Sequence, residues 1–141
     1  MNGKFIWYGR GVDGTILTPL SAIAAKQSNP AVHTMQRSQQ LLDYLATQEP
    51  AVLTYPKSNM VLAVHSDASY LNEEEARSRA SGHHFLSKDV PFPPNNGAIH
   101  NVAEIIKGVM SSAAKAELGA MYIDACKAVK ERIILDAMGH K

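Results

Sequence analysis

The pattern of apolar and polar positions divides the chain into a helical first third, a strand-rich middle and one long final helix. Apolar residues at helical spacing predict helices over residues 18–28 and 31–47. Thr18 and Pro19 are typical of a helix start, because a hydroxyl can cap the first turn and proline suits its first position. The two helices are joined by a proline-containing turn, so residues 1–50 are expected to form a helical hairpin.

Short runs of apolar and β-branched residues follow, bounded by proline, asparagine, glycine or charged residues. The charged stretch 71–79 between them is expected to be a solvated loop or a surface turn. The stretch 88–97 carries three prolines and is expected to be a loop. The runs predict strands over residues 52–55, 60–65, 80–87 and 98–106.

The last part of the chain has no proline and shows a helical pattern from Ser111 to Met138. Ser111 or Ser112 can cap its start, and Gly139 is expected to cap its end. Apolar positions recur at spacings of three and four, which predicts one buried stripe along this helix. The stripe comprises Leu118, Met121, Ala125, Val129, Ile133 and Ala137.

Composition and charge narrow the class of protein. The 141 residues suit a globular chain that can bury a core, and 14 basic against 13 acidic residues exclude a strongly basic footprint over the whole domain. No apolar run approaches the ~20 residues that span a bilayer, and the apolar core of the first residues is too short for a signal peptide. The single cysteine, Cys126, fits a reducing compartment and is expected to pack on the helix as a small residue.

Two carboxylates are the strongest candidates for chemistry. Asp67 ends an apolar strand, where its charge needs a metal ion, a basic partner or exposure at the rim of the sheet. Glu117 lies in the second turn of the long helix among small residues, so it can approach a sheet closely. If the helix packs across that strand, the two carboxylates could share a divalent cation such as Mg²⁺. The alternative is a strand-end aspartate that caps a turn and an exposed helix glutamate.

The other titratable residues show no recognisable metal pattern. The six histidines have no zinc-ligand spacing with Cys126. His83 and His84 point to opposite faces of a strand, so they make a poor chelating pair. Asp124 lies about 10 Å along the helix from Glu117, too far to join the same ion.

Three ordered motifs carry a resemblance to a known family. They are Val-His-Ser-Asp-Ala-Ser-Tyr at 64–70, Arg-Ser-Arg-Ala-Ser-Gly-His-His-Phe-Leu at 77–86, and Met-Ser-Ser-Ala-Ala-Lys-Ala-Glu-Leu-Gly-Ala at 110–120. In this order they resemble the ribonuclease H domain of copia-type LTR retrotransposon polyproteins. The resemblance covers about residues 60–140. Residues 1–50 resemble the helical segment that joins the polymerase to the ribonuclease H in such polyproteins.

The resemblance implies a fold and an activity. Asp67 matches the family's first catalytic aspartate and Glu117 its helix glutamate, and together they would hold Mg²⁺ or Mn²⁺. Two such ions would support hydrolysis of the RNA strand of an RNA/DNA hybrid. The family's remaining carboxylates lie beyond the position of Lys141. The expected fold is therefore α/β of the α+β type and partial: a helical segment over 1–50, then the N-terminal part of a ribonuclease H-like domain over 51–141, with an antiparallel three-stranded meander and a long helix.

The expected partners follow from the same resemblance. They are the RNA/DNA hybrid and the reverse transcriptase part of the same polyprotein, inside the cell in the cytoplasm or in virus-like particles, without a membrane. Ser69, Arg77 and Arg79 are candidates for contact with the nucleic-acid backbone, whereas a solvated charged turn is the alternative for this stretch.

A second hypothesis is a catalytically inactive remnant that serves as a scaffold or a protein-interaction module. The resemblance places the missing strands beside an exposed sheet edge, which could pair with another copy of the chain. The apolar stripe of the long helix could also bind a second chain. Because two-metal hydrolysis needs more carboxylates than Asp67 and Glu117, the fragment alone is expected to be inactive or poorly active.

Overall fold

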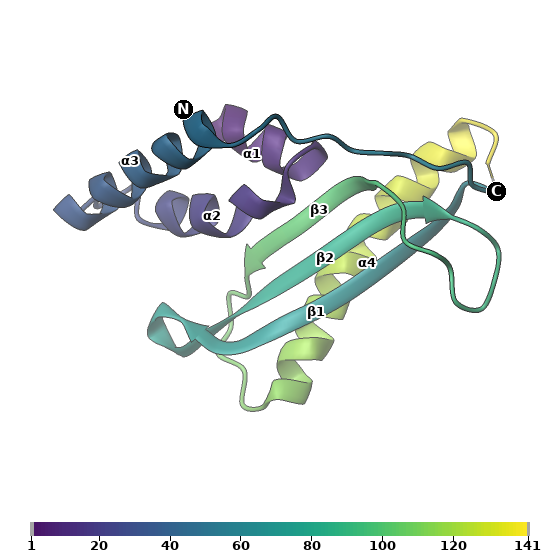
Figure 1. Ribbon diagram of the computed structural model, residues 1–141. Coiled ribbons are helices and arrows are strands. Elements are labelled where there is room, and N and C mark those ends of the chain that lie inside the picture. The colour runs from purple at the N-terminus through teal and green to yellow at the C-terminus, as the bar shows by residue number, and fades with distance from the viewer. Residues whose placement is uncertain (1, 141) are drawn as a thin grey trace. The chain divides into compact units, whose positions relative to one another are not determined.

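The computed structural model describes residues 2–140, which fall into two compact units, Met1–Val52 and Leu53–Lys141. The first unit contains the helices α1 (Asn2–Gly11), α2 (Leu17–Ala25) and α3 (Val32–Thr47), shown in Figure 1. A 3-10 turn, Gly14–Ile16, leads into α2. The core of this unit consists of Ile16, Leu20, Ile23 and Leu41.

The predicted pair of helices is present as α2 and α3, but the description as a helical hairpin missed α1. The glycines near the start of the chain are not typical of a helix. Gly9 nevertheless serves packing, because a Cβ at this position would lie 2.7 Å from Leu17 Cδ2. The predicted cap was also wrong: α2 begins at Leu17 rather than Thr18, and the Asp13 carboxylate accepts a hydrogen bond from Thr15 N at the start of the preceding turn.

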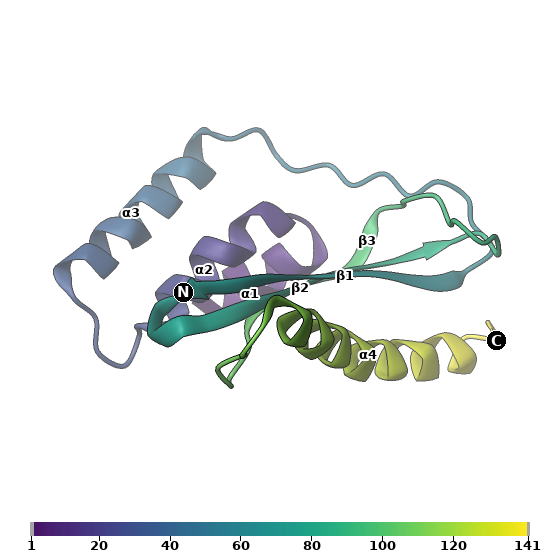
Figure 2. The same cartoon turned by 90° about the horizontal axis from the view of Figure 1, so that it is seen from below.

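The second unit is a three-stranded antiparallel sheet with one long helix on one face. The strands are β1 (Val61–Glu73), β2 (Arg77–Ser87) and β3 (Ala98–Ile105), in the order β1-β2-β3. Helix α4 (Ala113–Ala137) runs along one side of this sheet (Figure 2) and packs mainly on β1 and β2. The α+β class with a meander and a long helix is therefore confirmed. Among residues 2–140, no helix is both long and apolar enough to cross a membrane.

The charged stretch 71–79 was expected to be a loop, but most of it belongs to strands. β1 continues to Glu73 and β2 begins at Arg77, with only the 3-10 turn Glu74–Ala76 between them. The two strands pair at Glu73 and Arg77 after a bulge that follows Ser69. Side chains of this turn form ion pairs with one another, so charge here stabilises the tip of a long hairpin instead of marking a loop.

The predicted strand at 52–55 is absent, because this segment is tied to the sheet through side chains. Tyr55 Oη donates a hydrogen bond to the carbonyl of Ala98 at 2.8 Å. Asn96 Nδ2 donates to the carbonyl of Pro56 at 3.0 Å, which links the segment to the loop 88–97. Residues 48–60 have no regular secondary structure, and the loop at 88–97 is as expected.

Both predicted caps of the long helix are confirmed. Ser112 Oγ accepts a hydrogen bond from Lys115 N at 3.2 Å, and Gly139 follows the last turn with φ of 89°. The predicted buried stripe, however, is wrong. Its four large members face solvent with exposed fractions of 59–65%: Leu118, Met121, Val129 and Ile133. Its two alanines, Ala125 and Ala137, are exposed as well.

The face of α4 that meets the sheet is instead built from small and polar residues. Ala116, Ala120 and Asp124 are buried there, and Ala120 belongs to a core cluster with Ala80 and Ile106. Gly82 on β2 allows this approach, because a Cβ at this position would lie 2.2 Å from Asp124 Oδ1. Small residues bring the helix close to the sheet, and the apolar stripe consequently turns outward.

We expect Gly82→Ala to destabilise the second unit by ~1–3 kcal/mol, because the new methyl group cannot fit without moving α4. The measurement is the urea midpoint of unfolding. Gly108→Ala is the matched control, because a Cβ there meets only Met110 Cε at 3.8 Å. Equal midpoints for the two variants would contradict the close packing of Asp124 on Gly82.

Candidate functional site

The two predicted catalytic carboxylates lie on adjoining elements. Asp67 is on β1 and pairs with Ser81 of β2. Its neighbour Ala68 packs against the core cluster that contains Ala120 of α4. Glu117 lies on α4, three residues before Ala120. The strand segment that carries Asp67 and the helix turn that carries Glu117 are therefore packed together.

The side chains themselves do not converge. Because residues alternate between the faces of a strand and Ala68 faces α4, Asp67 points to the opposite face of the sheet. Asp67 and Glu117 are both exposed. A metal ion, a basic partner or exposure to solvent could compensate the charge of Asp67, and the structure shows exposure to solvent. As they are placed, the two carboxylates do not form a shared site for a cation.

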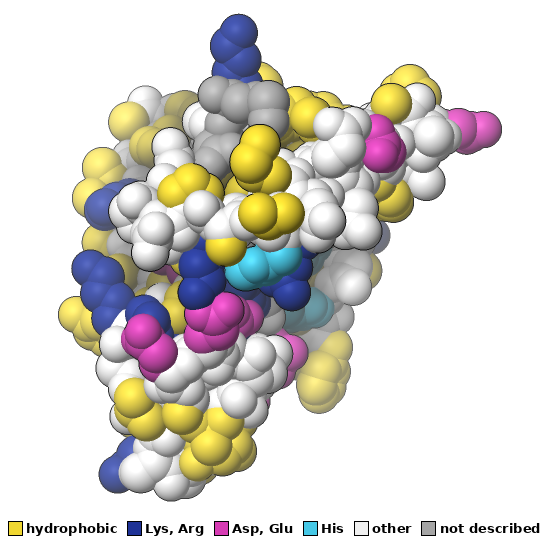
Figure 3. Space-filling model, turned by 90° about the vertical axis from the view of Figure 1, so that its left-hand side faces the viewer, with side chains coloured by type: hydrophobic (Ala, Val, Ile, Leu, Met, Phe, Trp, Pro, Cys, Tyr) yellow, Lys and Arg dark blue, Asp and Glu magenta, His cyan; other side chains and the backbone are white. Residues whose placement is uncertain are grey.

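The predicted backbone-binding residues lie at the β1–β2 turn and are engaged within it. Arg79 is buried, and its Nε donates to Glu73 Oε1 at 2.7 Å. Arg77 pairs with Glu75, and Ser69 Oγ donates to Asn72 Oδ1 at 2.8 Å. Figure 3 views the end of the molecule where this turn lies and shows acidic and basic side chains next to each other there. The contact of these residues with a phosphate backbone stays a prediction.

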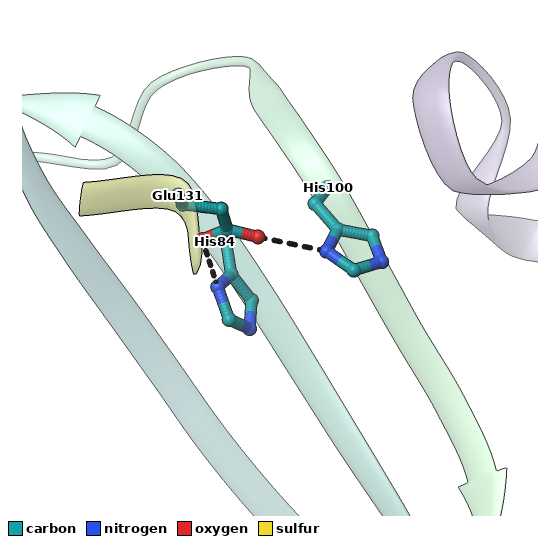
Figure 4. Close-up of side chains that lie close together, drawn as sticks. All are labelled: His84, His100 and Glu131. Atoms are coloured by element: carbon teal, nitrogen blue, oxygen red, sulfur yellow. Dashed lines mark hydrogen bonds and ion pairs between the residues drawn. The ribbon is translucent and has the colours of Figure 1, made fainter. Parts of the chain in front are cut away.

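A second group of titratable side chains lies between α4 and the sheet, and we call it the His84 cluster: His84, His100, Asp124 and Glu131. His84 Nδ1 donates to Glu131 Oε2 at 2.7 Å, and His100 Nδ1 donates to Glu131 Oε1 at 2.8 Å (Figure 4). These rings must be the donors, because a carboxylate only accepts. His84 Nε2 lies 3.4 Å from Asp124 Oδ1. His84 is fully buried, and its two ring nitrogens contact two carboxylates of α4.

The charges in the cluster stabilise one another. Burial raises the pKa of Glu131, but the hydrogen bonds from His100 and His84 outweigh this effect and lower the pKa to about 2. For His84, burial lowers the pKa, whereas Glu131 and Asp124 raise it, and the net shift is upward. The cluster thus favours the charged forms of His84 and Glu131.

One oxygen of the cluster lacks a partner. Asp124 Oδ2 is buried and has no hydrogen-bond partner within the described part of the chain. Asp124 also lines a groove of about 540 Å³ between β1 and α4, together with Val64, Ser66 and Met121. An unpaired buried carboxylate oxygen is costly, so this position indicates a charge that the surrounding protein compensates only in part.

The sequence analysis missed this cluster, although part of its reasoning was right. His83 and His84 do point to opposite faces: His83 contacts Asn101 across the sheet, while His84 contacts α4. The partner of His84 is His100, directly opposite on β3. His84 lies four residues before the loop 88–97 and His100 three residues after it, and the register shift between His84 and Phe85 makes up the difference. An approximate hairpin register was therefore the signal that could have suggested the pair.

Two smaller expectations on α4 also have outcomes. Cys126 is exposed rather than packed on the helix, so the prediction of a packed small residue was wrong. Asp124 is buried, and its partner is His84.

Within the His84 cluster, the side chains of His84, His100 and Glu131 each offer one ligand atom, and these three atoms lie within 4.8 Å of one another. Two imidazoles and a carboxylate are ligand types that transition metals accept.

Comparison with known proteins adds no relative. No protein-family model, curated protein or solved structure matches the chain.

The cluster predicts that stability depends on pH. Because the pKa of Glu131 falls from 4.5 to about 2 on folding, its contribution is present above pH 4.5 and is lost as the pH falls toward 2. This difference corresponds to about 3 kcal/mol. The raised pKa of His84 acts in the other direction: its contribution is complete below pH 6.5 and is lost at higher pH.

Glu131→Gln should therefore lower the free energy of unfolding by about 3 kcal/mol near pH 6 and flatten its decline between pH 4.5 and 2. Urea unfolding across this range, in buffer with EDTA, measures both effects. Glu117→Gln is the control, because Glu117 is an exposed glutamate of the same helix. A variant curve parallel to that of the wild type would contradict the role of Glu131.

Proposed function

We propose that the chain is part of a ribonuclease H-like domain of a retrotransposon polyprotein and acts in hydrolysis of the RNA strand of RNA/DNA hybrids. Its three motifs lie on β1, β2 and the start of α4, in the order that the resemblance implies. An antiparallel meander followed by a long helix is also the partial fold that the resemblance implies. A functional assignment still depends on the site residues.

The observation that carries the proposal is the packing of Ala68 against the cluster that contains Ala120. It brings the β1 segment with Asp67 next to the α4 turn with Glu117. Two elements far apart in the sequence thus carry these carboxylates on adjoining segments, with Asp67 on the face of the sheet opposite α4. Both carboxylates are exposed and accessible to a ligand from solvent.

The fit to Mg²⁺ is incomplete, because Asp67 points away from α4 and the two carboxylates do not meet. A two-metal site requires ligands on both sides of ions about 3.5–4 Å apart, which Asp67 and Glu117 alone cannot supply. Within this proposal, the chain contributes two of several carboxylates. The others come from a partner or from additional polypeptide.

The direct test is cleavage of a labelled RNA/DNA hybrid in Mg²⁺ or Mn²⁺. We expect slow cleavage by the wild-type chain, with the further carboxylates supplied by a second copy in a dimer. Asp67→Asn should lose about 100-fold or more, because a ligand to an ion that stabilises the transition state is worth several kcal/mol. Asp89→Asn, in the exposed loop 88–97, is the control and should cleave like the wild type. If none of the three proteins cleaves, the catalytic proposal fails for these residues.

The outward face of α4 favours a second candidate function, a protein-interaction module. Leu118, Met121, Ala125, Val129 and Ile133 form one stripe at spacings of three and four, and its four large side chains are more than half exposed. Tyr122, which is 70% exposed and one turn after Leu118, widens this face. A contiguous apolar surface on a regular helix is typical of a surface that binds another protein.

This second candidate predicts self-association through α4. The double variant Val129→Lys and Ile133→Lys should weaken it at least tenfold, because each buried apolar side chain is worth about 1.5–3 kcal/mol. Light scattering coupled to size-exclusion chromatography measures the mass across a concentration series. Lys130→Glu is the control for a change of charge without loss of apolar surface. A wild-type chain that stays monomeric at every concentration would exclude self-association.

A further inference from the structure

The His84 cluster has no role in hybrid cleavage, and its geometry points to a function of its own. We propose that His84, His100 and Glu131 form a binding site for a divalent transition metal ion of the Zn²⁺ class, which joins α4 to β2 and β3. The three residues come from three elements: β2, β3 and α4. An ion held by all three would fix the helix on the sheet.

The ligand atoms suit such an ion in kind and in spacing. One atom from each residue lies within 4.8 Å of the others. Zn²⁺ binds histidine nitrogen at about 2.0–2.1 Å and carboxylate oxygen at about 2.0–2.2 Å, so ligand atoms around it stand roughly 3–4 Å apart. The required contraction is small, and His100, with 24% of its side chain exposed, is free to turn inward.

The present hydrogen bonds already aim the ligands at one point. Glu131 accepts from both rings, so Nδ1 of His84 and Nδ1 of His100 face the same carboxylate (Figure 4). An ion between these atoms takes the place of the two ring hydrogens. The backbone need not move for this exchange, because all three side chains are already positioned by the helix and the sheet.

Asp124 provides the independent observation. Its side chain is only 2% exposed, and its Oδ1 lies 3.4 Å from Nε2 of His84. Carboxylates in this position orient metal-binding histidines through the second ring nitrogen. Its Oδ2 is buried without a hydrogen-bond partner among residues 2–140, so the cluster carries negative charge that a cation would balance.

Imidazole ligands favour a transition metal over Mg²⁺ or Ca²⁺, which prefer sites made of oxygen. Three protein ligands leave a fourth position of a tetrahedral ion for water. The partial exposure of His100 and Glu131, at 24% and 14%, gives an ion a path from solvent to this position. The site is therefore distinct in its chemistry and its residues from the carboxylate pair of Asp67 and Glu117.

The test starts with the chain stripped of metal by a chelator and dialysed. Co²⁺ is titrated first, because a tetrahedral Co²⁺ complex absorbs in the visible range, and Zn²⁺ is then added to displace it. We expect one ion per chain, displacement of Co²⁺ by Zn²⁺, and an increase of Tm in Zn²⁺. Zn²⁺ should bind more tightly because, with a full d shell, it loses no ligand-field stabilisation in a tetrahedral site. Glu131→Gln and His100→Asn should each lose the visible signal, whereas His65→Asn, an exposed histidine of the same sheet, should keep it.

Asp124→Asn separates an orienting role from a ligand role. It should keep the tetrahedral spectrum and bind Co²⁺ 10–100-fold more weakly. Far-UV circular dichroism shows whether each variant is folded, and His100→Asn is the most informative because its site is only partly buried. The proposal is overturned if the folded wild type gives no tetrahedral Co²⁺ signal. It is equally overturned if His65→Asn abolishes the signal while His100→Asn retains it.

Discussion

The second unit depends on the contact of Asp124 and Glu131 of α4 with His84 of β2. Holding three ionisable groups at a helix–sheet interface is costly unless each finds a partner of opposite charge. His84 meets this condition by bonding to both carboxylates, and His100 occupies the second oxygen of Glu131. Gly82 supplies the space for Asp124, so one glycine and one histidine on β2 together decide where the helix can lie.

This contact explains why α4 turns its apolar side outward. A helix normally places its apolar stripe on the core, because burial of large side chains is the main source of stability. Here the buried cluster at α4 consists of Ala80, Ile106 and Ala120, with the partly buried Ala68, Met110 and Ile123 packed against it. Small residues let α4 approach the sheet closely. Ionic contacts then stabilise the interface in place of the apolar surface that larger side chains would bury. Such an interface fixes the orientation of α4 on the sheet, because charged hydrogen bonds are directional whereas apolar contacts are not.

Much of the fold could be predicted from the sequence because its signals are local. Proline and glycine mark the loop 88–97, Ser112 and Gly139 mark the ends of α4, and the apolar runs mark the three strands. The register of β2 against β3, in contrast, depends on residues that are distant in the sequence, so no local signal revealed it. It sets His84 opposite His100, and without it the histidines looked unrelated. The face of α4 was misjudged because periodicity shows that a stripe exists, not which side of it is covered.

The same distinction applies to Asp67 and Glu117. The apolar patterns placed them on a strand and a helix, although Asp67 lies in the middle of β1 rather than at the expected strand end. The direction of a side chain depends further on the pleat of its strand. A shift of one residue exchanges the two faces of the strand, and Ala68 occupies the face toward α4. Because β1 is an edge strand, its free side is the place where further polypeptide can pair and change the surroundings of Asp67. The His84 cluster, in contrast, lies wholly within the second unit.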